Sequence, residues 1–428
     1  MPYRYAIRAL ALLVTSFSVT AQTEVKLTAA DGAMGDLFGS SVAVDGDTAV
    51  IGAYDDDDGG STSGSAYVFS RDQGGTDMWG QIVKLTADDA AAADRFGWSV
   101  AVDGDTAAVG AYQDDDDGID SGSAYVFSRN QGGADMWGQV VKLTADDAAA
   151  ADRFGWSVAV DGDTAAVGAY QDDDDGMDSG SAYVFSRDQG GADMWGQVGK
   201  LTAADAAAFD YFGYSVAVDG DTALVGAFSE GLGGSAYVFS RNEGGANMWG
   251  QVAKLTAADA AGTDYFGYSV AVDGDTAVIG AYRDDDNGST SGSAYVFSRD
   301  QGGVDMWGQV AKLTAADGFA GDRFGYSVAV DGNTAVIGAY DDDDGGSTSG
   351  SAYVFSRDQG GADMWGQVGK LTAADAAADD GFGWSVAVDG DTAVFGAYGD
   401  DDDGDSSGSA YVMFGSPVPV ELQHFAVD

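Results

Sequence analysis

The chain has 428 residues, 70 acidic and 19 basic side chains, and a formal net charge of −51. A surface this negative repels nucleic acid and anionic membranes, which excludes both as partners. Cysteine is absent and His424 is the only histidine, so disulfides, a cysteine nucleophile, histidine-bound zinc and a Ser-His-Asp triad are not expected.

Residues 1–21 have the pattern of a signal peptide. Arg4 and Arg8 supply the positive start, residues 9–19 are mainly apolar, and Ala21 ends a small-residue cleavage site. No later stretch is apolar for long enough to span a bilayer. The pattern predicts a protein that is secreted or held at the cell surface after cleavage, without membrane insertion.

The rest of the chain is a tandem repeat marked by the dipeptide Phe-Gly. Its spacing is 58 residues except for one interval of 54. The dipeptide begins at Phe38, Phe96, Phe154, Phe212, Phe266, Phe324 and Phe382. Repetition at such a period indicates one supersecondary unit per repeat.

Each unit contains four strand-like segments. In the second unit these are "FGWSVAV", "TAAVGAY", "SAYVFSR" and "WGQVVKLTA", separated by Asp-Gly, aspartate-rich and glycine-rich turns. Four antiparallel strands per repeat are typical of a β-propeller blade, and a solenoid of stacked hairpins is the alternative. On one face of the first strand we expect Phe96, Trp98 and Val100 side by side, so that Phe-Gly serves inter-blade packing.

The two ends of the repeat region complement each other. It begins with the fourth-strand pattern "TEVKLTA" and finishes with three strands that lack a fourth. We therefore predict an all-β, seven-bladed propeller over residues 24–414, closed by the N-terminal strand pairing into the last blade, followed by a tail over 415–428. Fourth strands carry a lysine, which we interpret as a charge that protects an outer edge from pairing. These lysines are Lys26, Lys84, Lys142, Lys200, Lys254, Lys312 and Lys370.

The motif "FGWSVAVDGDTAAVGAY" resembles the FG-GAP repeat of integrin α-subunit propellers and of many secreted or surface bacterial proteins. This resemblance covers almost the whole chain after residue 21 and implies extracellular recognition or adhesion. One departure concerns calcium: integrin-type repeats carry a D-x-D-x-D-G loop between the first two strands, where this chain has only "VDGDT". The calcium residues of the family therefore cannot be transferred to those positions.

An aspartate tract such as "YDDDDGG" lies between the second and third strands of six units. Because the connections between strands 2 and 3 and between strands 4 and 1 leave a propeller on the same side, we expect one strongly acidic face. Oxygen-rich loops suit Ca²⁺, although Tyr54 stands where an EF-hand-like pattern needs its first carboxylate. The calcium candidates are Asp56, Asp58, Asp115, Asp117, Asp173, Asp175, Asp285, Asp342, Asp344, Asp401 and Asp403. The alternative is a solvated, salt-adapted loop, as in a halophilic protein; the fourth unit has "FSEGLGG" instead, so a blade folds without the tract.

A second candidate site consists of the aromatic residues that follow Phe-Gly, where the first unit has Ser40. They are Trp98, Trp156, Tyr214, Tyr268, Tyr326 and Trp384. Aromatic platforms beside carboxylates suit sugar recognition, whereas burial between blades is the alternative. Burial of the rings would exclude the sugar platform.

The repeated, nearly identical units do not bring unlike residues together as an active site requires. The sequence predicts a non-enzymatic extracellular recognition or adhesion module with an acidic face, whose binding is calcium-dependent if the tracts hold Ca²⁺. A lectin-like propeller and a surface-layer spacer are the alternatives. The expected partner is an extracellular protein or a glycan.

Overall fold

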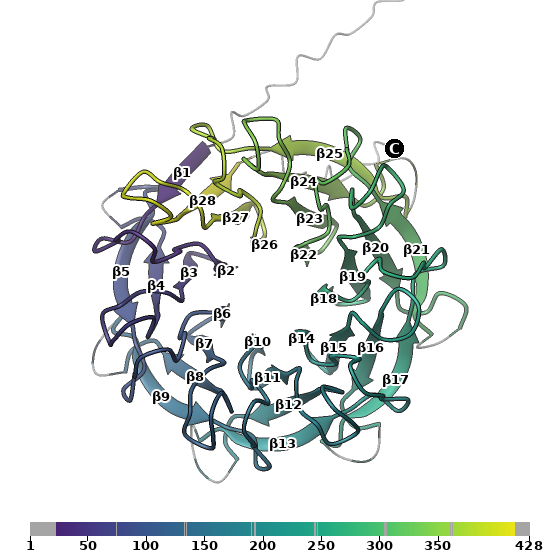
Figure 1. Cartoon of the computed structure of the whole chain (residues 1–428), viewed down its shortest axis with the longest axis horizontal. Helices are drawn as coiled ribbons and strands as arrows, with labels where there is room; N and C mark the ends of the chain where they lie inside the picture. The colour runs from purple at the N-terminus through teal and green to yellow at the C-terminus, as the bar shows by residue number, and fades with distance from the viewer. Residues whose placement is uncertain are drawn as a thin grey trace, which may run out of the picture.

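The computed structural model describes residues 23–415 except 74, 132, 134, 190, 192, 193, 244, 246, 304, 305, 360 and 362. The predicted signal peptide and residues 416–428 of the predicted tail lie outside this part. Within it, seven four-stranded antiparallel sheets form a closed ring (Figure 1). This arrangement confirms the predicted seven-bladed propeller.

Each sheet is one blade, numbered here in chain order. Blade 1 contains β2 (Ser41–Asp45), β3 (Thr48–Ala53), β4 (Ser65–Ser70) and β5 (Gly80–Leu85). Blade 2 contains β6 (Ser99–Asp103), β7 (Thr106–Ala111), β8 (Ser123–Ser128) and β9 (Gly138–Leu143). Blade 3 contains β10 (Ser157–Asp161), β11 (Thr164–Ala169), β12 (Ser181–Ser186) and β13 (Gly196–Leu201). Blade 4 contains β14 (Ser215–Asp219), β15 (Thr222–Ala227), β16 (Ser235–Ser240) and β17 (Gly250–Leu255). Blade 5 contains β18 (Ser269–Asp273), β19 (Thr276–Ala281), β20 (Ser293–Ser298) and β21 (Gly308–Leu313). Blade 6 contains β22 (Val328–Asp331), β23 (Thr334–Ala339), β24 (Ser351–Ser356) and β25 (Gly366–Leu371). Blade 7 contains β26 (Val386–Asp389), β27 (Thr392–Ala397), β28 (Ser409–Phe414) and β1 (Thr23–Leu27).

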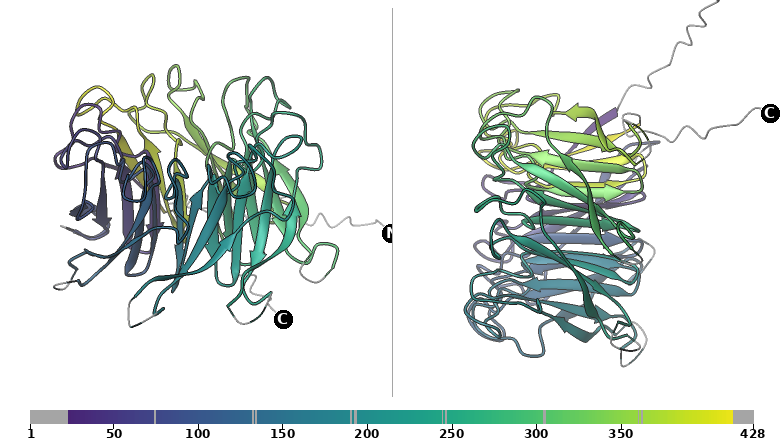
Figure 2. Two further views of the ribbon diagram at one scale, coloured as in Figure 1. Left: turned by 60° about the horizontal axis from the view of Figure 1, so that its bottom comes forward. Right: turned by 90° about the vertical axis from the view of Figure 1, so that its right-hand side faces the viewer.

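The first strand of each blade lies nearest the axis and the fourth lies at the rim, and the connections leave the ring on two opposite sides (Figures 1 and 2). Strand β1 pairs antiparallel with β28, with Thr23 opposite Phe414 and Leu27 opposite Ala410. The N-terminal strand therefore closes the ring, as predicted, and it covers the edge of β28 that would otherwise be open.

The hydrophobic core lies between adjacent blades. The cluster between blades 1 and 2, for example, joins Val50 and Val68 of blade 1 to Phe96 and Val109 of blade 2. Phe96 is fully buried and its ring meets that of Tyr125 edge-on, with centroids 5.5 Å apart. Burial of this kind, repeated at each interface, supplies the main stabilisation of a chain without disulfides.

Glycine follows this phenylalanine because the backbones of two blades meet there. Gly97 has φ +92°, and a Cβ atom built on it would lie 2.1 Å from the carbonyl oxygen of Ser65 in blade 1. Only glycine accommodates both the left-handed backbone and the close approach. The Phe-Gly pair is thus a packing unit, in agreement with the sequence-based interpretation.

Polar contacts also run around the inner ring. The carboxylate of Asp45 in β2 accepts a hydrogen bond from the backbone N–H of Gly104 in blade 2 at 2.9 Å. The last link joins Asp389 of blade 7 to the N–H of Gly46 of blade 1 at 2.8 Å. Among the described residues, no helix is long and apolar enough to cross a membrane.

Candidate functional site

The lysine of the fourth strand lies among aspartates instead of guarding an open edge. In blade 2, Lys142 Nζ donates hydrogen bonds to Oδ2 of Asp89 at 2.8 Å and to Oδ2 of Asp114 at 2.9 Å, and it also contacts Asp116. Asp114 and Asp116 belong to the tract of that blade, whereas Asp89 belongs to the connection that enters it. Burial disfavours the charged amine, but the hydrogen bonds to the three carboxylates outweigh burial and raise the pKa of Lys142.

The same arrangement recurs in six blades, centred on Lys26, Lys84, Lys142, Lys200, Lys312 and Lys370. One aspartate in each is buried and also accepts a hydrogen bond from a tyrosine of the third strand, as Asp114 does from the Tyr125 hydroxyl at 2.9 Å. The repeated carboxylates are therefore partly neutralised by the chain's own ammonium groups. We call each such group a lysine–aspartate cluster.

The structure shows which aspartates take part. In blades 1 and 6, Asp56 with Asp58 and Asp342 with Asp344 contact the lysine, and all four are among the predicted calcium candidates. In the other four blades with a tract, the contacting residues precede the candidates by one position. They are Asp114, Asp116, Asp172, Asp174, Asp284, Asp286, Asp400 and Asp402.

The remaining candidates of those blades lie outside the clusters. Asp115, Asp173, Asp285 and Asp401 each accept a backbone N–H five residues further on and so shape the turn. Asp117, Asp175 and Asp403 are exposed loop residues. The contacting aspartate lies three residues after the end of the second strand, as Asp56 does after Ala53 and Asp114 after Ala111, so the end of this strand sets the register of the tract.

The clusters have part of what a metal site needs. In four blades, three carboxylates offer oxygen atoms within 4.8 Å of one another, close enough to share one ion. These sets are Asp89, Asp114, Asp116; Asp147, Asp172, Asp174; Asp259, Asp284, Asp286; and Asp375, Asp400, Asp402. In each set, however, a lysine ammonium bonds the same three carboxylates, and Ca²⁺ requires six to eight oxygen ligands. These sets could therefore hold a metal ion, which would compete with the lysine ammonium for the same carboxylates.

Blade 4 keeps the cluster without the tract. Glu230 in its short loop accepts from Lys254 at 2.9 Å, and Asp205 of the incoming connection does so at 2.7 Å. The Ser235 hydroxyl donates to the other Glu230 oxygen at 2.5 Å. One glutamate therefore replaces the two aspartates of the other blades, which leaves this lysine with two carboxylates.

The predicted aromatic residues gather around the axis. Trp98, Trp156, Tyr214, Tyr268, Tyr326 and Trp384 line one cavity of about 420 Å³ together with Ser40 and Tyr54. All six rings are half-buried. We call this cavity the axial funnel. Tyr54 directly precedes the tract of blade 1, so the funnel opens on the side of the ring where the aspartate loops lie.

The six rings form a chain of contacts around the funnel. Neighbouring rings from Trp98 through Trp156, Tyr214, Tyr268 and Tyr326 to Trp384 have centroids 4.6–5.4 Å apart. Ser40 interrupts the circle at blade 1, where the Tyr54 ring contacts Trp98 at 4.8 Å. Burial raises the pKa of Tyr214 and Tyr326 well above the ordinary value, and hydrogen bonding to the Tyr268 hydroxyl adds to this shift.

The expectation that Phe96 and Trp98 share one face is wrong. Phe96 packs between blades, whereas Trp98 lines the funnel. Between them lies Gly97 with its left-handed φ, which breaks the alternation of an extended strand, and β6 starts only at Ser99. Tyr54 was missed as a lining residue, although an aromatic residue ends the second strand of each unit.

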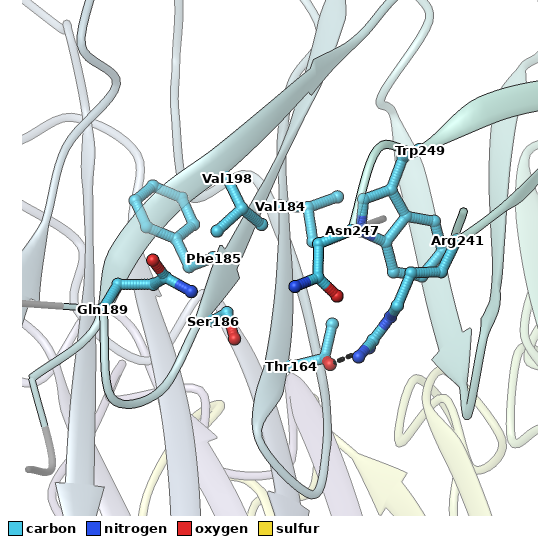
Figure 3. A pocket seen from close by; sticks show the side chains of 9 residues that line it. All are labelled: Thr164, Val184, Phe185, Ser186, Gln189, Val198, Arg241, Asn247 and Trp249. Carbon is cyan, nitrogen blue, oxygen red and sulfur yellow. Dashed lines mark hydrogen bonds between the residues drawn. The ribbon is translucent and has the colours of Figure 1, made fainter. Parts of the chain in front are cut away.

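The opposite side of the ring has crevices between blades with volumes of about 10 to 90 Å³, much smaller than the axial funnel. The one between blades 3 and 4 has a volume of about 10 Å³, room for one water molecule at most. There Arg241 donates a hydrogen bond to Thr164 and lies over the Trp249 ring (Figure 3). The arginines of these loops thus connect neighbouring blades.

Comparison with known protein families gives one assignment. The family model described as FG-GAP repeat matches residues 22–69, 79–127, 137–185, 195–239, 249–297, 307–355 and 365–413. No curated protein matches the chain. Each matched segment joins the fourth strand of one blade to the first three strands of the next, and together the matches cover most of the sequence. The chain therefore belongs to the FG-GAP repeat family.

Proposed function

We propose that the protein is a non-enzymatic recognition module that acts outside the cell and binds its ligand at the axial funnel. The observation that carries this proposal is the cavity of about 420 Å³ lined by six half-buried aromatic rings. A concave, largely aromatic cavity at the centre of a repeat protein is a usual place for a ligand. FG-GAP propellers are generally non-enzymatic and typically extracellular, which agrees with the signal peptide predicted over residues 1–21.

The ligand group that fits best is an alkylammonium cation. Its charge is attracted by the faces of aromatic rings, an interaction worth about 0.5–2 kcal/mol per contact depending on desolvation. The funnel lining contains no acidic side chain, yet the chain carries a net charge of −51, which concentrates cations near its surface. We expect the aspartate loops to form an acidic face around the funnel mouth and to steer a positively charged partner towards it.

Titration with tetramethylammonium chloride tests the ligand class. Ionic strength is held constant with sodium chloride, and tryptophan fluorescence and isothermal calorimetry report binding. We expect saturable binding with a Kd of about 1 mM, the strength of a few cation–π contacts, and its loss in the variants Trp156→Leu and Trp384→Leu. Trp137→Phe, which changes a tryptophan outside the funnel, is the matched control. A linear response without saturation would contradict the proposal.

Sugar binding is the second candidate, because the rings are not fully buried and pyranose rings stack on aromatic faces. Methyl glycosides titrated under the same conditions distinguish the two candidates. Saturable binding of a glycoside, without binding of tetramethylammonium, would make the protein a lectin-like propeller.

We further propose that recognition does not require calcium, because the lysine ammonium groups already neutralise the carboxylates that a calcium ion would need. Comparing ligand binding in calcium and in chelator tests this point. If chelator abolishes binding, and calcium but not magnesium recovers it, the recognition is calcium-dependent and this proposal is wrong.

A further inference from the structure

Blade 4 differs from the other blades on the side of the funnel mouth. Its loop between β15 and β16 lacks the aspartate tract and exposes Leu232, whose side chain is 79% accessible. The connection that enters the blade exposes Phe209, which is 47% accessible and donates its backbone N–H to the carbonyl of Met177 in blade 3. Met177 itself is 61% accessible. Leu232 therefore lies where the other blades carry their aspartate tract, whereas exposed apolar side chains also occur in corresponding loops of other blades, at Ile119 and Phe319.

A second change accompanies the first. Before Phe-Gly, blades 2, 3 and 6 have an arginine that pairs with an aspartate, as Arg323 pairs with Asp341 at 2.8 Å. Blades 4 and 5 have Tyr211 and Tyr265 at this position. The Tyr211 ring stacks on Phe228 with an interplanar angle of 13°, and Phe228 also contacts Tyr265. An aromatic layer thus stands where blades 2, 3 and 6 have ion pairs.

This layer is continuous with the axial funnel. Phe228 meets Tyr214 of the funnel at 4.6 Å, and Tyr170 contacts both Tyr211 and the funnel residue Trp156. Phe209 lies two residues before Tyr211, and Leu232 lies four residues after Phe228. Both exposed side chains therefore belong to the two loops that carry Tyr211 and Phe228. We call Met177, Phe209, Tyr211, Phe228, Leu232 and Tyr265 the blade 4 sector.

We infer that the blade 4 sector binds an apolar side chain of an extended segment of a partner protein, whose cationic side chain enters the axial funnel. This inference rests on the proposed function. An isolated exposed apolar side chain needs no explanation, but here Phe209 and Leu232 accompany an aromatic layer that continues into a ligand cavity, which marks an interaction surface. Carboxylates flank the sector, because Asp173 and Asp175 are exposed in the loop that carries Met177 and Lys200 contacts neither of them. Charge complementarity therefore favours a basic segment. Because the sector occurs in one part of a nearly symmetric ring, it would fix the orientation in which the segment binds.

Two series of peptides test the inference with the full chain. In one series an acetylated lysine is joined to a C-terminal leucine amide by roughly one to six glycines, which spans the distances that an extended chain can cover. In the other series serine replaces leucine. We expect at least one spacer length at which the leucine peptide binds roughly tenfold more tightly than its serine counterpart, the gain from burying one apolar side chain.

The variants identify where the gain arises. The double variant Phe209→Ser with Leu232→Ser is expected to remove the tenfold difference and to leave the affinity of the serine peptide unchanged. Phe319→Ser, which alters an exposed phenylalanine in the connection that enters blade 6, is the matched control and should preserve the difference. Equal affinities of leucine and serine peptides at every spacer length, or a difference that survives the double variant, would overturn the inference.

Failure of the funnel proposal gives a different result. Replacing the lysine of the peptides by norleucine tests the cationic ligand class. If the affinity is unchanged, and the leucine peptide still binds more tightly than the serine peptide only when Phe209 and Leu232 are present, the cationic ligand class is wrong and binding at the blade 4 sector is supported. If no peptide of either series binds, the inference is overturned.

Discussion

Lys142 Nζ and Asp114 Oδ2 lie 2.9 Å apart, with the carboxylate almost fully buried and also bonded to the Tyr125 hydroxyl. The same ammonium holds Asp89 of the connection that enters the blade. A positive charge on the outermost strand thus fixes two acidic loops that would otherwise repel each other. The relationship also explains how an aspartate tract can recur in a folded ring.

Removing one of these ammonium groups should destabilise the protein. We expect Lys142→Met to lower the free energy of unfolding by about 1–3 kcal/mol, because it leaves the buried Asp114 carboxylate without its cation. Lys254→Met is the matched comparison and should cost less, since that lysine bonds two carboxylates instead of three. Urea unfolding at fixed salt measures both. An unchanged stability of Lys142→Met would mean that desolvation offsets the attraction.

Calcium should not stabilise the native protein specifically. At high, constant ionic strength we expect equal melting temperatures in calcium, magnesium and chelator, because the lysines occupy the centres of the carboxylate sets. The Lys142→Gln variant should gain a calcium-specific rise, since it frees Asp89, Asp114 and Asp116 for an ion. A calcium-specific rise in the native protein would show that an ion binds without displacing a lysine.

Stability should have a maximum in mildly acidic solution. Burial raises the pKa of Asp94, Asp152, Asp322 and Asp380 from 3.8 to about 6. Between these values the folded state binds more protons than the unfolded state, so the free energy of unfolding rises as the pH falls from about 6 towards 4. Each site contributes on the order of 1 kcal/mol.

Other carboxylates act in the opposite sense at lower pH. Burial tends to raise the pKa of Asp89 and Asp147, but the hydrogen bonds from Lys142 and Lys200 lower it. Their stabilisation is lost as the pH falls below about 4. Thermal unfolding measured from about pH 3 to 8 should show the highest melting temperature between about pH 4 and 6. Replacing Asp94, Asp152, Asp322 and Asp380 together by Asn should flatten the decrease above about pH 5, and an unaltered profile would contradict the assignment.

Closure of the ring should depend on β1. Deleting residues 23–27 removes the outer strand of blade 7 and exposes the edge of β28. We expect a lower melting temperature and association of the protein through that edge, detected by light scattering. Lys26→Met, which removes the ion pairs of β1 and keeps its backbone pairing, should lower the melting temperature without association. A monomeric deletion variant would show that the open edge is protected in another way.

The number of blades, the strand order and the closing strand could be predicted from the sequence. They follow from the regular spacing of Phe-Gly and from the two incomplete ends of the repeat region, which together make one blade. Phe-Gly at a regular interval counts the blades, and the N-terminal strand "TEVKLTA" completes the blade whose other three strands end in "SAYVMFG". The predicted alternation failed at the glycine of each Phe-Gly pair, as at Gly97, where a left-handed φ redirects the next side chain. The position of Trp98 beside Tyr54 and Trp156 depends on that single backbone angle and on the ring closing around an axis.

The amino-acid sequence by itself determined the propeller, because hydrophobic alternation and turn residues act locally and repeat in each unit. Only the tertiary structure decided what the charged and aromatic residues do. Lys142 lies far from Asp89 in the chain, and the six rings of the funnel come from six blades, so their contacts form only when the blades fold and pack side by side. Local patterns specify elements, whereas the neutralisation of a carboxylate depends on which ammonium group the fold brings within hydrogen-bonding distance.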